Sequence, residues 1–188
     1  MIQITNDQIE RVNLILSGIP GGAQKAFSSV IRRANSTVKA ETVRQITGTY
    51  TISAQRVRAG GNIRAQVQKA DGGVVGTVTF AGYKLPLYRF NVTPTLPIQR
   101  AEVKAAVMRG NGQTPFAHAF IARMKSGHTG MFERETGRSF PVTEFMAQST
   151  AQMAGNEEVL EQVSEKAQET VNKRIEHEIT RILNGYGG

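Results

Sequence analysis

The sequence predicts an α+β fold with N-terminal helices, an antiparallel β-sheet of several strands and a long C-terminal helix packed on the sheet. Apolar residues recur every three or four positions over Leu160–Ile182, which is the spacing of one helix face. Apolar and charged residues alternate within Ile98–Val107, the pattern of a half-buried strand. Three short apolar pieces divided by glycine turns occupy Phe116–Val142, and small sheets are built from such pieces. At 188 residues the chain is expected to form one domain, 1–188.

The helical N-terminal part of this domain is predicted at residues 1–60. A first helix is expected at Thr5–Leu16, and the breaker-rich run Ser17–Gly22 ends it. A long second helix follows at Ala23–Thr47, with apolar residues on one face and cations on the other. A short basic helix at Thr51–Arg58 completes this part.

The β-sheet region is predicted at residues 61–146. Strands at 63–67 and 74–80 are joined by Ala70–Gly73, a strong hairpin signal. The second of these strands has apolar or β-branched residues on both faces, which favours a central position. Three prolines exclude a regular central strand from Tyr83–Pro97, and we interpret this apolar loop as a candidate contact with a neighbouring subunit.

The C-terminal helical part is predicted at residues 147–188. The small, methionine-rich run at 146–156 indicates a short helix. Asn156 is placed to cap the final long helix, whose apolar stripe continues to Ile182, and Gly185 suits its end.

Charge is unevenly distributed along the chain, whose net charge is +8 and whose pI is about 10.1. Residues 1–70 carry +7, whereas residues 155–188 carry −3. Two interpretations of the basic part remain open. The cations are either solubilising groups on a solvated face or a surface for DNA or an acidic partner, where phosphate contacts would make binding salt-dependent.

The sequence gives little support to an enzyme. Without cysteine there is no disulfide, thiolate nucleophile or cysteine-ligated zinc, and neither a nucleophile elbow nor a phosphate loop is visible. One alternative is a small hydrolase in which His118, His128 and Glu133 hold a metal ion, with the histidines meeting across a hairpin. A polar strand face and a turn explain the same histidines. We therefore expect no enzymatic activity and no cofactor.

The start of the chain lacks a basic region followed by an apolar run, so no signal peptide is expected. No apolar run approaches the ~18 residues that a membrane span needs. These features predict a soluble protein that is made in the cytoplasm and has no membrane contact.

One stretch resembles a known family. The segment FIARMKSGHTGMFER, followed by FPVTEF and MAQSTAQM, resembles the phage minor tail protein Z family, whose members are also described as tail completion proteins. The resemblance is densest over Phe116–Met153 and implies an architectural pattern. It implies a structural virion protein at the head-proximal end of a long-tailed phage, where it completes the tail tube and joins it to the head connector as a ring around the DNA channel.

The expected partners follow from that resemblance. They are further copies of the chain in a ring such as a hexamer, the tail terminator or tail tube proteins, the head–tail connector, and genomic DNA held by non-specific electrostatics. The protein would be made in the host cytoplasm and reside in the virion. The alternative function is that of a general basic nucleic-acid-binding protein without enzymatic activity.

Two sets of candidate residues accompany this hypothesis. The predicted subunit or partner interface comprises Tyr88, Phe90, Phe116, Phe120, Met131, Phe132 and Pro141. The predicted surface for channel DNA or an acidic partner comprises Arg32, Arg33, Lys39, Arg44, Arg56 and Arg58.

Overall fold

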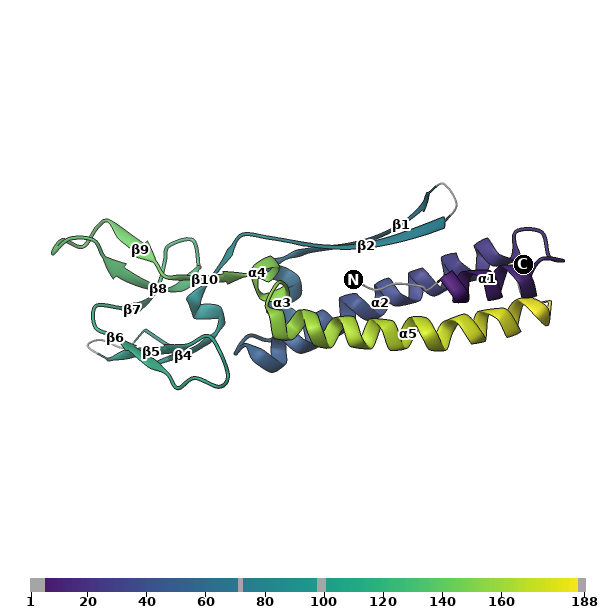
Figure 1. Cartoon of the computed structure of the whole chain (residues 1–188). Coiled ribbons are helices and arrows are strands. Elements are labelled where there is room, and N and C mark those ends of the chain that lie inside the picture. Colours follow the sequence, from purple (N-terminus) through teal and green to yellow (C-terminus); the bar gives the residue numbers. More distant parts are fainter. Residues whose placement is uncertain (1–5, 71–72, 98–100, 186–188) are drawn as a thin grey trace. The chain divides into compact units, whose positions relative to one another are not determined.

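The structure is a computed structural model that describes residues 6–70, 73–97 and 101–185. It contains both helices, 46% of the chain, and strands, 27%, and the strands form antiparallel sheets (Figure 1). The predicted α+β class is therefore confirmed. Two compact units make up the chain. The first contains the described residues of 1–42, 63–79 and 160–188, and the second contains those of 43–62 and 80–159.

Three helices form the core of the first unit: α1 (Asn6–Ile15), α2 (Gly22–Thr49) and α5 (Glu157–Leu183). They lie side by side in Figure 1, and α2 and α5 each extend into the second unit. The buried side chains that join them are Val12, Leu16, Ala26, Val30, Ala34, Val171, Ile175, Ile179 and Ile182. Burial of these apolar side chains is the main stabilising term of the unit.

The C-terminal helix follows the predicted pattern with one correction. Asn156 caps its start, since Oδ1 accepts hydrogen bonds from the backbone N–H groups of Glu158 at 3.1 Å and Val159 at 3.4 Å. Gly185 follows its end with φ of +81°, a conformation that favours glycine. Leu160, the predicted first residue of the apolar stripe, is 49% exposed, and Val159 is buried in its place.

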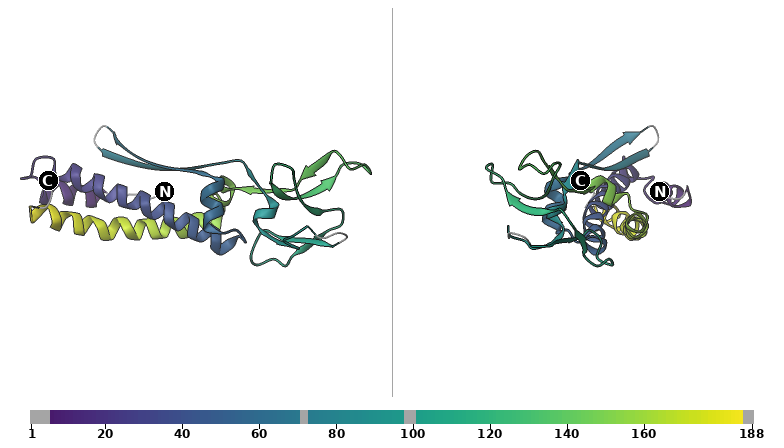
Figure 2. Two further views of the ribbon diagram at one scale, coloured as in Figure 1. Left: turned by 180° about the vertical axis from the view of Figure 1, so that it is seen from behind. Right: turned by 90° about the vertical axis from the view of Figure 1, so that its left-hand side faces the viewer.

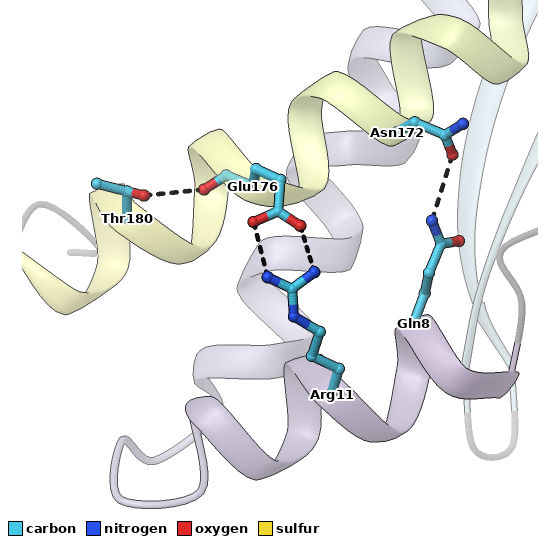
Figure 3. A network of polar contacts seen from close by, with 5 residues as sticks. All are labelled: Gln8, Arg11, Asn172, Glu176 and Thr180. Carbon is cyan, nitrogen blue, oxygen red and sulfur yellow. Dashed lines mark hydrogen bonds and ion pairs between the residues drawn. The ribbon is translucent and has the colours of Figure 1, made fainter.

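Polar side chains also join α1 to α5 along the solvent side of their contact (Figure 3). Arg11 donates two hydrogen bonds to the Glu176 carboxylate, at 2.6 and 3.1 Å, and Gln8 donates one to Asn172 at 3.3 Å. More than half of the Arg11 and Glu176 side-chain surface is exposed, so the pair adds no more than about 1 kcal/mol. These bonds fix the register of the two helices, and the apolar core holds them together.

One carboxylate of α5, that of Glu178, is almost fully buried. It accepts a hydrogen bond from Arg181 Nε at 2.7 Å, and Arg174 Nη2 lies 3.4 Å away. Burial alone opposes its ionisation, but hydrogen bonds from Arg181 and from Ser29 of α2, with the charges of both arginines, hold the pKa of Glu178 below its usual value. His177 Nδ1, on an exposed side chain, lies 3.8 Å away.

The predicted hairpin is present as β1 (Asn62–Ala70) and β2 (Gly73–Ala81). These two strands form a sheet of their own, so the central position predicted for the second strand is wrong. The ribbon is anchored on α2, where Asn35 Nδ2 donates to the carbonyl oxygen of Gln66 at 2.8 Å. At Gly76, a Cβ would lie 2.4 Å from Ile31 Cγ2, so only glycine allows this close contact.

The second unit contains most of the strands and two short helices. Its elements are α3 (Ala54–Gly60), β3 (Lys84–Pro86), the 3₁₀ helix η1 (Leu87–Arg89), β4 (Asn91–Thr93), β5 (Val103–Ala106), β6 (Thr114–Phe116), β7 (Phe120–Arg123), β8 (Thr129–Arg134), β9 (Val142–Glu144), β10 (Met146–Ser149) and α4 (Thr150–Ala154). They form three antiparallel sheets in the orders β4–β5–β6, β7–β8–β9 and β10–β3.

The proline-containing segment 83–97 is packed against this unit. It supplies β3, η1 and β4, and its side chains Leu85, Leu87, Phe90 and Val92 are buried. Thr51, two residues after α2, is bound to β5, since its hydroxyl donates a hydrogen bond to the Ala106 carbonyl at 2.6 Å. The strand predicted at 98–107 is shorter in the structure, and residues 98–100 lie outside the described residues.

Across the described helices, none has the length and hydropathy of a membrane span.

Candidate partner-binding surface

The turn between β7 and β8 explains the Gly-His-Thr-Gly sequence on structural grounds. Gly127 has φ of +84°, and its N–H donates to the Met124 carbonyl at 2.9 Å, which closes the turn. His128 follows, and its Nε2 lies 2.7 Å from Oε1 of Glu144 in β9. This contact links the β7–β8 turn to the end of β9.

Gly130 makes room for the His128–Glu144 contact. A Cβ at this position would lie 2.4 Å from Glu144 Oε1 and 2.8 Å from Phe132 Cζ. The ring of Phe132 packs edge-on against the His128 ring, with 6.2 Å between ring centroids. The two glycines, the histidine and the phenylalanine therefore serve the geometry of one sheet.

The metal site of the hydrolase alternative is not assembled. His128 pairs with Glu144 and not with Glu133, and His118 is an exposed residue beyond β6. Within the ranges that the structure describes, no three His, Cys, Asp or Glu side chains are grouped to hold a metal ion.

The residues predicted as an interface divide into three classes. Phe90, Met131 and Phe132 are buried within the unit and act as core residues, so a partner does not reach them. Tyr88 and Phe120 are half-buried, and each contacts another residue of the unit. The Tyr88 hydroxyl donates a hydrogen bond to the Thr95 carbonyl at 2.6 Å. The Arg134 guanidinium lies 4.6 Å from the centre of the Phe120 ring, as in a cation–π contact.

The third class comprises Phe116 and Pro141. Pro141 is exposed and follows a cis peptide bond after Phe140, which is 71% exposed at the β8–β9 connection. Phe116 lies in an open groove and forms an edge-to-face pair with Phe145, with 5.2 Å between ring centroids and an interplanar angle of 71°.

This groove of the second unit has a volume of about 600 Å³, enough to receive a ligand. Strands β3, β5, β6 and β10 surround it. Its floor and rim include Lys84, Leu87, Ala105, Ala106, Met108, Asn111, Thr114, Phe116, Phe145, Met146, Gln148 and Gln152. Two backbone hydrogen bonds hold Phe145 in the groove. Its carbonyl accepts from the Leu87 N–H at 2.8 Å, and its N–H donates to the Met131 carbonyl at 2.9 Å.

The rim of the groove exposes apolar side chains. Met108 is 36% and Met146 47% exposed, and a pair of flexible thioether side chains can adapt to the shape of a bound partner. The polar side chains of the lining are three amides, the hydroxyl of Thr114 and the ammonium group of Lys84. The arrangement suits an apolar peptide segment with backbone or side-chain groups that bond to amides. Sequence reasoning missed Met108 and Met146, because they lie far apart in the sequence and line one groove only in the folded unit.

The six predicted cations divide between the units. Arg32 and Arg33 are exposed and Lys39 is half-buried in the first unit; Arg44, Arg56 and Arg58 are exposed in the second. Arg56 has a structural role, since its Nη1 donates to the Arg89 carbonyl at 2.6 Å and joins α3 to η1.

Replacing Arg56 with alanine should therefore lower the free energy of unfolding by about 1 kcal/mol, the value of an exposed charged hydrogen bond. Arg58→Ala removes a neighbouring cation from the same helix and should stay within about 0.5 kcal/mol of the parent protein. Urea denaturation followed by circular dichroism measures both. Equal losses for the two variants would show that the Arg56–Arg89 bond contributes nothing.

Comparison with protein-family models, with curated proteins and with solved structures finds no match to this chain.

Proposed function

We propose that this protein is a structural component of a phage particle that completes the tail at its head-proximal end and joins it to the head connector. The observation that supports this most strongly is the groove of the second unit. Phe116, Phe145 and Met146, which line it, fall within the stretch that resembles the tail completion family. A stretch that builds a rigid sheet and an apolar groove fits an assembly role.

The chemistry of the groove also favours binding over catalysis. Apolar side chains and neutral amides dominate its lining, with Lys84 as its one described cation. Such a surface gains affinity from burying apolar area and from amide hydrogen bonds. In the proposed function, a segment of a tail tube, connector or neighbouring copy fills this groove.

The first test is quantitative mass spectrometry of purified virions from the phage or prophage that encodes the chain. We expect a small fixed copy number, as for one ring. Absence from virions would refute the proposal, and the same protein should then be tested for salt-dependent binding to free DNA, the alternative that its net charge of +8 suggests.

The second test asks whether the groove is the contact surface. A double variant, Met108→Glu with Met146→Glu, places two charges on the rim at exposed positions and should reduce the yield of infectious particles at least a hundredfold in a complementation assay. Leu14→Glu is the control, because Leu14 is 78% exposed on α1, belongs to no predicted interface and does not line the groove. Full complementation by the double variant would exclude the groove as an assembly surface.

A further inference from the structure

The outer edge of β2 differs from every other described strand edge of the protein. The strand is nine residues long, GVVGTVTFA, and contains neither a charged residue nor a proline. Strand β1 is equally long, but its sequence contains charged residues and its Gln66 carbonyl is bonded to α2. The remaining described edge strands are three or four residues long, and β6 contains Pro115, β7 Arg123 and β9 Glu144. Short length, proline and charge are the usual protections of edge strands against pairing with another chain. Strand β2 has none of them.

The hydrogen-bonding groups along this edge have no described partner outside the ribbon. The sheet consists of β1 and β2 alone, and both views of Figure 2 show no third strand beside β2. Among the described residues, no backbone or side-chain hydrogen bond reaches β2 from another element. The hydrogen bond that joins the ribbon to α2 is made by the other strand, β1, whose Gln66 carbonyl accepts from the Asn35 side-chain amide. The outer edge of β2 is thus a row of free donors and acceptors.

We propose that the β2 edges of two copies of this chain pair antiparallel, so that two ribbons form one four-stranded sheet in a twofold dimer. A two-stranded ribbon is marginal in water, and additional strands stabilise it. This contact goes beyond the proposed function and does not depend on it, because a ring repeats a heterologous interface whereas this pairing is isologous.

The sequence of β2 allows a second copy as the occupant, because pairing through this strand keeps like charges out of the contact. The protein has a net charge of +8, so most surfaces of two copies repel one another. Strand β2 brings no charge to a contact with itself, whereas β1 would bring Arg64. The side chains of Val75, Thr77 and Thr79 are exposed at alternate positions, and paired β-branched side chains of this kind stabilise antiparallel strands.

The absence of cysteine from the chain gives a direct test. Val75→Cys, Thr77→Cys and Thr79→Cys, each made singly, are oxidised in the purified protein. In a twofold antiparallel pair, a residue next to the axis faces its own copy, and a residue two positions away is displaced from its copy by about 14 Å at ~3.4 Å per residue. A disulfide needs Cα atoms within about 7 Å.

We expect one of the three positions to form covalent dimers in high yield, at least tenfold above the other two. If the axis lies between two positions, a mixture of the corresponding two variants forms the dimer instead. Gln68→Cys, at an exposed position of β1, is the matched control and should remain uncrosslinked. Equal crosslinking at all positions, or none in any single variant or mixture, would overturn the proposal.

A second measurement does not depend on cysteine. Thr77→Lys places a charge on the edge and should weaken self-association at least tenfold in analytical ultracentrifugation, while Gln68→Lys should leave it unchanged. The far-ultraviolet circular dichroism of both variants should match the parent protein. Two results would refute β2 pairing. One is a parent protein that stays monomeric at every concentration that analytical ultracentrifugation can measure. The other is a Thr77→Lys variant that dimerises as well as the parent protein. Neither result would bear on the virion measurement.

Discussion

Replacing Phe132 with alanine should lower the free energy of unfolding by about 3–5 kcal/mol, the usual cost of removing a buried aromatic side chain. Phe132 is 5% exposed and its ring centroid lies 6.2 Å from those of both Phe120 and His128. Its loss leaves a cavity beneath the His128–Glu144 contact. It also removes the Phe132 ring, which a Cβ at Gly130 would approach to 2.8 Å. The shift of the urea midpoint measures the effect.

Phe140→Ala is the control for this prediction. It removes the same side chain from the connection that follows β8, but Phe140 is 71% exposed, so the change should stay within about 0.5 kcal/mol. Comparable losses in the two variants would mean that Phe132 is not a core residue of the second unit.

Replacing Glu178 with glutamine should lower the free energy of unfolding at pH 7 by about 2–3 kcal/mol. Removing one partner of a fully buried ion pair costs about 3–5 kcal/mol, and the cost is smaller here because the Arg174 and Arg181 side chains are each 35% exposed. The variant leaves these two arginines beside an uncharged amide. Denaturation of parent and variant at a series of pH values measures the difference.

The pH dependence of that difference has a definite sign. The pKa of Glu178 is lower in the folded protein than its usual value of 4.5, so the folded state favours the ionised form. The stabilisation is complete above about pH 4.5 and is lost as pH falls through the lower folded pKa. Parent and variant should therefore converge in acid. A difference that stays constant down to low pH would show that packing and not charge causes the loss.

Glu176→Gln provides the matched comparison on the same helix. Its partner Arg11 is well exposed, so the loss should be only about 0.5 kcal/mol. If Glu176→Gln were as costly as Glu178→Gln, burial of the carboxylate would not be the deciding factor.

Helices were predictable from the sequence because their signals are local. Asn156 precedes the last helix and Gly185 follows it, so both end signals lie next to the helix in the sequence. The apolar residues of this helix recur in every turn. The misplaced Leu160 shows the limit of such a pattern. Two adjacent apolar residues fit the same spacing, and only packing selects Val159 for burial.

Strand partners were less predictable because pairing is not local. Strand β2 has apolar residues on both faces, as a central strand does, yet only β1 pairs with it. Likewise, nothing near His128 in the sequence indicates Glu144, which the β8–β9 register brings within reach. Phe132 and Phe140 have the same side chain, and the fold makes one a core residue and the other a surface residue.

The core of the first unit joins segments that lie far apart in the sequence, and this has a consequence for the order of events during synthesis. Residues 12–34 must find residues 171–182, which are synthesised more than 130 residues later. Until then, the apolar faces of α1 and α2 are without the helix that covers them. A nascent chain therefore exposes a hydrophobic surface until α5 has been made, and truncation within α5 removes the cover from α1 and α2.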